Sequence, residues 1–111
     1  MAPEDLRGAA PSAAGEVFAL GLVLCELYTG RRVMRGRSVG ELRREHEAGA
    51  PEQAVGLLEG RAPRVAAILA RCLAPDARER PELEEVRQRF EAERDQRPLT
   101  DAQLRPAGSP N

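Results

Sequence analysis

Residues 15–30 read GEVFALGLVLCELYTG, and this stretch decides the fold. Its inner residues are apolar on every side of a helical wheel, and such a helix is normally buried all round. A short apolar run also suits a buried strand. Helix is favoured because Glu16 places a carboxylate at the helix start and Gly30 suits the helix end. The stretch therefore predicts a helix over residues 16–28 at the centre of a larger assembly.

A polar segment over residues 38–47 is predicted to be a short helix. Ser38 and Glu41 stand three positions apart, which is the spacing of a capping box at a helix start. The only apolar contact of this helix is expected from Val39 and Leu42, so the segment should lie at the surface.

Two further helices are predicted over residues 63–73 and 81–94, and each begins with a proline, which suits the first turn of a helix. In both, the apolar residues follow the helical repeat and form one stripe. The stripes consist of Val65, Ile68, Leu69, Cys72 and Leu73 in the first helix, and Leu83, Val86 and Phe90 in the second.

The remaining segments are expected to be irregular. Residues 1–15 are rich in Pro, Ala and Gly, residues 31–37 form a basic loop, and residues 50–62 hold at most one helical turn. Residues 95–111 carry three prolines and little apolar content, which predicts a disordered tail. The expected fold is all-α, with four main helices in one domain over residues 1–94.

The charged residues exclude several classes of function. They nearly cancel, leaving a formal charge of −1, so neither nucleic acid nor membrane is expected as a partner. All 17 basic residues are Arg, which excludes a Schiff-base or phosphate-binding lysine. The richness in Arg and Ala suggests a bacterial source. With no signal pattern and no apolar run near the ~18 residues of a membrane span, a cytoplasmic protein is expected.

No catalytic constellation is visible among the remaining reactive residues. His46 stands between Glu45 and Glu47 and is predicted to be a solvated surface histidine. Cys25 and Cys72 lie within apolar helical patterns and are predicted to be reduced, buried thiols. The spacing of His and Cys fits no zinc site.

A set of short motifs in a fixed order carries a more specific signal. The set comprises Ala2-Pro3-Glu4, then Glu16-Val17-Phe18-Ala19-Leu20-Gly21 in the apolar helix, then Arg71-Cys72-Leu73 and Arg80-Pro81. This succession resembles the end of the protein kinase domain, in particular that of bacterial serine/threonine kinases. In that family an Ala-Pro-Glu closes the activation segment, an Asp-Val-Tyr-Ser-Leu-Gly-type helix follows, and an Arg-Pro opens the final helix. The resemblance covers residues 1–94.

The resemblance implies structural roles for several residues. Glu4 would pair with Arg80 and tie the activation segment to the lower lobe, the alternative being two unrelated surface charges. Glu26 matches a position that faces the substrate peptide in some kinases, the alternative being a plain helix-surface glutamate. The segment 38–47 would be an exposed element for partners. The helix over residues 16–28 would be the hydrophobic axis of that lobe. Its scaffold positions would be Glu16, Phe18, Leu20 and Gly21.

The resemblance also implies what this chain lacks. The family's ATP and magnesium are held by motifs that precede Ala-Pro-Glu, so no cofactor is expected here and the chain is expected to be an inactive, truncated kinase domain. The family has Asp where this chain has Glu16, and the extra methylene would displace the carboxylate. The expected partner is the missing kinase portion or another protein, with self-association through bare apolar surface. The alternatives are a stand-alone helical interaction module and an unrelated helical regulator.

Overall fold

The computed structural model describes residues 1–96 of the 111-residue chain. Among these residues it contains six α-helices, one 3₁₀ helix and no strand, so the predicted all-α class is confirmed. The elements are α1 (Pro3–Leu6), α2 (Ala13–Thr29), α3 (Val39–Glu47), α4 (Ala50–Gly56), α5 (Pro63–Cys72), η1 (Ala77–Glu79) and α6 (Leu83–Gln96).

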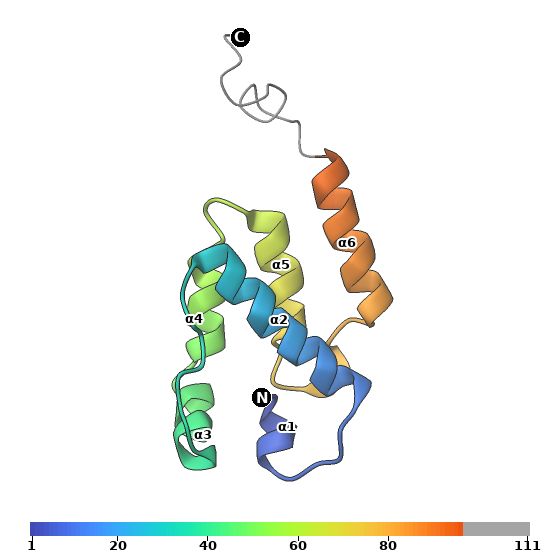
Figure 1. The fold of residues 1–111 in the computed structure, drawn as a ribbon. Coiled ribbons are helices and arrows are strands. Elements are labelled where there is room, and N and C mark those ends of the chain that lie inside the picture. Colours follow the sequence, from blue (N-terminus) through green and yellow to red (C-terminus); the bar gives the residue numbers. More distant parts are fainter. Residues whose placement is uncertain (97–111) are drawn as a thin grey trace.

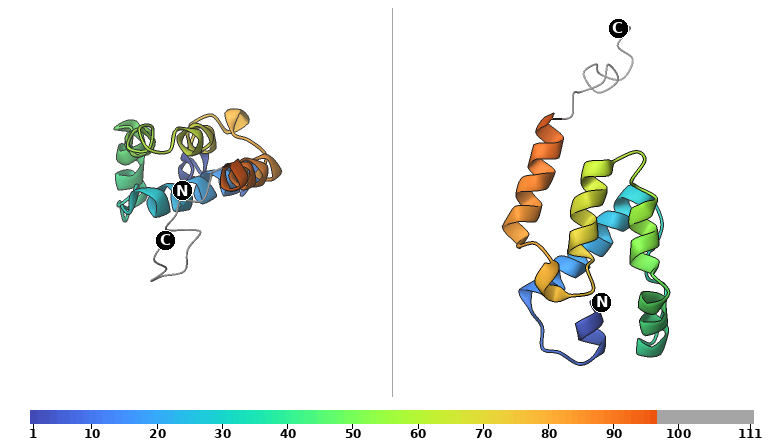
Figure 2. Two further views of the ribbon diagram at one scale, coloured as in Figure 1. Left: turned by 90° about the horizontal axis from the view of Figure 1, so that it is seen from above. Right: turned by 180° about the vertical axis from the view of Figure 1, so that it is seen from behind.

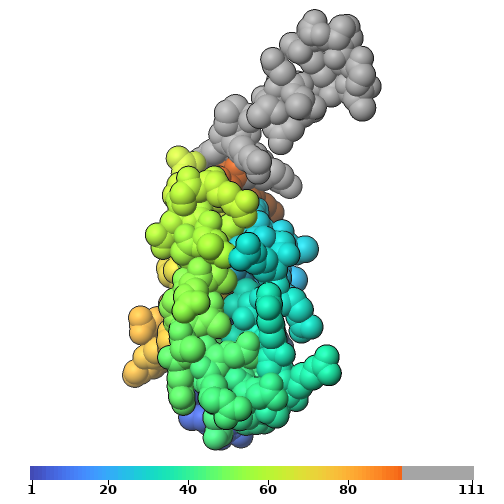
Figure 3. Space-filling model, turned by 90° about the vertical axis from the view of Figure 1, so that its left-hand side faces the viewer, coloured from blue at the N-terminus to red at the C-terminus, as the bar shows by residue number. Residues whose placement is uncertain are grey.

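Helix α2 lies diagonally across α4 and α5, which run side by side on one face of it (Figures 1 and 2). Helix α6 packs against α5, while α1 and α3 contact each other at the opposite end of the molecule. Residues 31–60, which include α3 and α4, form the side of the molecule seen in Figure 3. Helix α2 is therefore the element around which the other helices are arranged.

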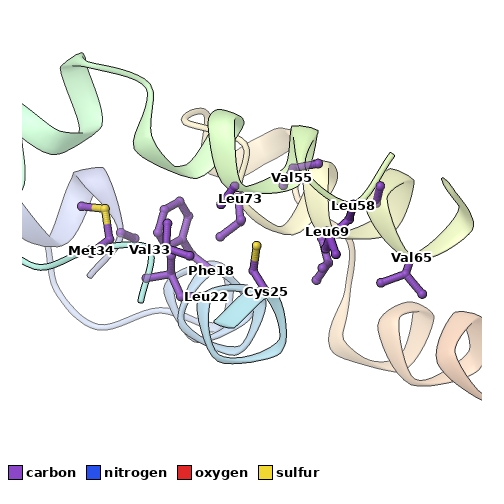
Figure 4. Packing of buried hydrophobic residues seen from close by; sticks show 13 residues of the cluster. Phe18, Leu22, Cys25, Val33, Met34, Val55, Leu58, Val65, Leu69 and Leu73 are labelled. Carbon is purple, nitrogen blue, oxygen red and sulfur yellow. The ribbon is translucent and has the colours of Figure 1, made fainter. Parts of the chain in front are cut away.

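The main core lies between α2 and the α4–α5 pair (Figure 4). Phe18 points from α2 toward Leu73, Cys25 points toward Leu69, and Leu58 completes the layer after α4. Phe18, Cys25, Leu58 and Leu69 are fully buried. Burial of a large apolar side chain contributes roughly 1.5–3 kcal/mol, so this layer stabilises the crossing of the helices. A second cluster holds α6 in place and consists of Val17, Ile68, Cys72 and Val86.

Helix α5 and the two cysteines follow the sequence prediction closely. The five residues of the predicted α5 stripe are all buried. Cys25 and Cys72 are free thiols in the interior. Burial raises the pKa of the Cys72 thiol to about 11, so it stays protonated at neutral pH.

The start of α2 differs from the prediction, which placed it at Glu16 after a loop. Ser12 is the N-cap, and its hydroxyl accepts a hydrogen bond from the Gly15 N–H at 3.0 Å. A serine followed by alanines suits this role, because Ser satisfies a free N–H and Ala has the highest helix propensity. The predicted end is confirmed, since Gly30 caps α2 in the left-handed conformation with φ 75°.

The expectation that an all-round apolar α2 is buried on every side holds for one side only, and the other side is the bare apolar surface that was also expected. Val23 is 51% exposed and Leu27 is 73% exposed, and both lie on the face that turns away from α4 and α5. The described helices cover one side of α2 only. Val23 and Leu27 stand about one helical turn apart, so together they form an apolar stripe at the surface of α2.

Two short helices occur where irregular chain was expected. In α1, Pro3 takes the first position, and the Asp5 carboxylate accepts the Ala2 N–H at 3.2 Å. Helix α4 follows Gly49, whose φ of 79° turns the chain, and buries one face against α5. Its buried residues are Pro51, Ala54 and Val55, and the same helical spacing continues to the buried Leu58 just beyond the helix.

The outer helices differ from prediction at single residues. Ser38 caps α3 as expected, with its hydroxyl accepting the Glu41 N–H at 3.1 Å, but Val39 is exposed. In α6, Val86 is buried, whereas Leu83 is exposed because it lies in the first turn, before the helix meets α5. Helix α6 continues to Gln96, two residues beyond the predicted end of the domain. The rest of the expected tail, residues 97–111, lies outside the described residues.

Candidate functional site

Glu4 and Arg80 form an ion pair that joins α1 to the segment before α6. Arg80 Nη1 donates to Glu4 Oε2 at 2.5 Å, and Nη2 donates to Oε1 at 2.8 Å. Two parallel hydrogen bonds of this kind fix the relative orientation of the two side chains as well as the distance between them. The Arg80 side chain is fully buried and that of Glu4 is 15% exposed, so the pair belongs to the interior.

The remaining N–H groups of Arg80 bind backbone carbonyl oxygens. A guanidinium has five N–H donors, and together with the two bonds to Glu4 all five are used. The carbonyl acceptors are those of Ala74 at 2.9 Å, Ala14 at 3.1 Å and Pro75 at 3.3 Å. Arg80 therefore ties together α1, the start of α2 and the chain that follows α5.

Phe18 lies between Arg80 and α3. The Arg80 guanidinium lies 4.9 Å from the centre of the Phe18 ring, within the range of a cation–π contact. The His46 ring lies 5.4 Å from the Phe18 ring, and His46 Nε2 lies 2.9 Å from the Met1 carbonyl oxygen. The prediction of a solvated histidine is wrong, because His46 is half-buried and links α3 to the N-terminal segment.

The chain before Arg80 is shaped by local interactions. Asp76 is the N-cap of η1, and its carboxylate accepts the backbone N–H of Arg78 at 2.9 Å. Arg80 itself has an extended backbone, with φ −78° and ψ 147°, which is the conformation that a following proline favours. Pro81 thus helps to direct the Arg80 side chain into the interior.

The charge of Glu4 is stabilised by this arrangement. The hydrogen bonds from Arg80 are the main cause of a lowered Glu4 pKa, against the opposing effect of burial. Glu4 is therefore ionised at neutral pH, and the buried guanidinium has its counter-charge.

The four residues expected to mark the axis of the lobe have different environments. Phe18 and Gly21 are buried, Leu20 is half-buried, and Glu16 is exposed in the first turn of α2. Gly21 allows α2 and α5 to approach closely, because a Cβ there would lie 2.8 Å from the Cys72 Cβ. These residues position α2, and only Glu16 has a side chain free for polar chemistry.

Glu26 supports the loop that follows α2. Its Oε2 accepts the backbone N–H of Val33 at 3.0 Å, and the side chain is half-buried. Glu45 does the same from α3, accepting the N–H groups of Arg35 at 2.7 Å and Gly36 at 2.6 Å. Sequence reasoning missed Glu45, because contacts between a helix side chain and a distant loop leave no periodic pattern.

The chain matches no protein-family model, no curated protein and no solved structure. No helix in the described part of the chain has the length and apolar character needed to cross a membrane. Within residues 1–96, no three His, Cys, Asp or Glu side chains gather as metal ligands. The chain also has no lysine.

Proposed function

We propose that this chain is the substrate-side helical part of a serine/threonine protein kinase-like domain of bacterial type, acting in the cytoplasm. The family's activity is ATP-dependent phosphorylation of serine and threonine in proteins. The single observation that carries the proposal is the buried pair between Glu4 and Arg80. It joins the Ala-Pro-Glu and Arg-Pro motifs, which lie at opposite ends of the resemblance.

The positions of the other motif residues support the proposal. Phe18 and Gly21, from the motif in α2, are both buried at the crossing with the rest of the chain, and Phe18 also contacts Arg80. Three motifs that are weak singly therefore meet around one buried guanidinium. This contact among the three motifs favours the kinase-like interpretation over an unrelated helical regulator.

The proposed role is structural, and phosphoryl transfer is not expected from this chain alone. A kinase requires a lysine and an Asp-held magnesium to neutralise the phosphates, and the chain contains neither that lysine nor the Asp-Phe-Gly motif. ATP and magnesium would be held by the remaining portion of such a domain. That portion is the proposed partner, and it would cover the bare stripe of α2.

A second candidate function is a helical interaction module. The observation in its favour is the exposed apolar stripe of α2, in which Val23 and Leu27 stand one turn apart. Exposed apolar surface of this kind promotes association with another protein or with a second copy. The two candidates differ in what covers the stripe.

The DNA upstream of the Met1 codon distinguishes the two candidates. In-frame His-Arg-Asp and Asp-Phe-Gly codons there support the kinase-like domain. A promoter and ribosome-binding site immediately before Met1 would instead support the module. The expected inactivity has its own test, which is calorimetric titration of the chain with magnesium-ATP. No specific binding heat is expected, and saturable binding would overturn the assignment of a purely structural role.

A further inference from the structure

The loop between α2 and α3, residues 31–37 and hereafter the arginine loop, concentrates positive charge at the surface (Figure 3, teal). Four of its seven residues are Arg, and all four are exposed. Their guanidinium groups have no hydrogen-bond or ion-pair partner among residues 1–96, unlike those of Arg71, Arg80 and Arg87. The four are Arg31, Arg32, Arg35 and Arg37.

The backbone of the arginine loop is held from both sides. The Glu26 carboxylate binds the N–H of Val33, and the Glu45 carboxylate binds the N–H groups of Arg35 and Gly36. Val33 and its neighbour Met34 are buried in the main core (Figure 4). The loop is therefore anchored at its centre, while its guanidinium groups remain in solvent.

Gly36 shows how closely the loop approaches α3. A Cβ at this position would lie 2.7 Å from Glu45 Oε1 and 2.9 Å from the backbone nitrogen of Leu42. These distances are too short for any other residue without a shift of the loop. The approach brings the loop N–H groups onto the Glu45 carboxylate, so Gly36 and Glu45 act together to fix the loop.

Charge in this protein is segregated. Residues 31–45 contain six Arg and two Glu, a net charge of +4, and the whole chain carries −1, so the remainder carries −5. The arginine loop spans at most about 20 Å, because extended residues advance by about 3.5 Å each. Arg31 with Arg32, and Arg35 with Arg37, stand one and two positions apart, so their backbones are within about 7 Å. This is less than the Debye length of about 8–10 Å, so the neighbouring charges reinforce one another.

We propose that the arginine loop is a docking surface for a short, carboxylate-rich segment of a partner protein. Arg presents a planar fork that binds carboxylates bidentately. A backbone fixed before binding lowers the ordering cost that binding incurs. The side chains that fit this surface are Asp and Glu, spaced along an extended segment over the length of the loop.

A nucleic acid fits this surface less well than an acidic peptide. Binding of single strands relies on aromatic side chains that stack on bases, and the arginine loop has none. Duplex DNA extends well beyond a loop of this length, and the −5 charge of the remaining chain opposes it. An anionic membrane fits poorly as well, because the loop's two large apolar residues, Val33 and Met34, point into the core.

The test is a fluorescence anisotropy titration of the full chain with a labelled glutamate-rich peptide. The matched probe has Gln in place of each Glu. We expect saturable binding of the Glu peptide that weakens steeply with added salt, and no binding of the Gln peptide. Equal binding of both peptides, or tighter binding of a single-stranded oligonucleotide or of phosphatidylserine vesicles, would overturn the proposal.

A pair of charge-matched variants tests the location. One variant changes Arg31, Arg32, Arg35 and Arg37 to Gln, and we expect about tenfold or greater loss of peptide affinity. The control changes four exposed arginines elsewhere to Gln, which lowers the net charge equally and should leave the affinity within a factor of about two to three. Equal loss in both variants would place the binding outside the loop. The control positions are Arg7, Arg78, Arg87 and Arg89.

The Glu45→Ala variant distinguishes binding to a loop that is fixed in advance from simple attraction between opposite charges. The substitution makes the protein more positive, so simple attraction predicts tighter binding of the acidic peptide. Loss of the hydrogen bonds to Arg35 and Gly36 frees the loop, so a fixed docking surface predicts weaker binding by several-fold. Circular dichroism checks that the helices persist. Tighter binding by a folded E45A variant would contradict the role of the fixed loop.

Discussion

Glu4 and Arg80 stand 76 positions apart in the sequence and are joined by two hydrogen bonds in the interior of the protein. The pair differs from the exposed pairs of this chain, such as Arg87 with Glu84, because the Arg80 side chain has no contact with solvent. Exposed pairs contribute about 0–1 kcal/mol, whereas loss of one partner of a buried pair costs about 3–5 kcal/mol. The fold should therefore depend on this pair far more than on its surface charges.

The first prediction concerns Arg80→Lys. Lysine keeps the charge but has three donors at one point, so it leaves the Glu4 carboxylate and the carbonyls of Ala14 and Ala74 incompletely paired. We expect the free energy of unfolding in urea to fall by about 3 kcal/mol. Arg87→Lys on the surface is the matched control, and we expect it to change the free energy of unfolding far less. Similar losses in both variants would show that burial of the pair has no energetic consequence.

The second prediction concerns the pH dependence of stability, from the lowered pKa of Glu4. Because the folded-state pKa lies below the ordinary value of 4.5, the contribution of Glu4 is fully present above that value. It is lost as the pH falls through the folded-state pKa. The measured quantity is the difference in unfolding free energy between the wild type and Glu4→Gln. We expect this difference to stay constant from neutral pH down to about pH 5 and to narrow below it. A difference that persists to about pH 2 would contradict an ionised Glu4.

The third prediction compares the same substitution in two helices. Gly21→Ala adds a Cβ within 2.8 Å of the Cys72 Cβ, so α2 and α5 must separate. We expect the free energy of unfolding to fall by about 1–3 kcal/mol, although alanine has the better helix propensity. Gly56→Ala in α4 meets nothing within 4 Å and should stabilise by about 0.4–1 kcal/mol. Thermal melts of both variants test the opposite signs, and a stabilising Gly21→Ala would refute the close crossing.

The fourth prediction concerns the bare stripe of α2. Leu27 is 73% exposed, so Leu27→Gln should weaken self-association of the chain while changing the unfolding free energy by less than about 0.5 kcal/mol. Sedimentation equilibrium over a range of concentrations measures the association. Leu69→Ala serves as the buried control, and we expect it to lower the free energy of unfolding by about 2–5 kcal/mol. An unchanged, strictly monomeric state in both wild type and Leu27→Gln would argue against an adhesive stripe.

The helices with regular apolar spacing were predictable from the sequence, as α5 shows. Its stripe from Val65 to Leu73 is buried throughout, because a period of 3.6 residues directs one face inward. The segment from Pro51 to Leu58, which contains α4, carries the same spacing. At most one turn was expected there, and a helix of seven residues shows its period for fewer than two turns.

The site was predictable in part. The resemblance directed attention to Glu4 and Arg80, yet the carbonyl partners of Arg80 depend on how three segments pack, which no local pattern encodes. Bare apolar surface was expected, but the sequence did not show that Leu27 would be among its residues. An apolar side chain favours burial, but it is buried only where other helices pack over it.

The most direct test of the central claim is a chimaera of a bacterial serine/threonine kinase in which residues 2–96 of this chain replace the kinase's own segment from its Ala-Pro-Glu onward. The measurement is the initial rate of magnesium-ATP-dependent phosphorylation of a serine peptide. The account predicts transfer within about a hundredfold of the parent rate, because in the proposed kinase-like domain the extra methylene of Glu16 would displace a positioning carboxylate by about an ångström. It also predicts a higher rate for Glu16→Asp and a lower one for Arg80→Lys. A folded chimaera whose rate does not exceed that of the parent truncated before Ala-Pro-Glu would contradict the claim.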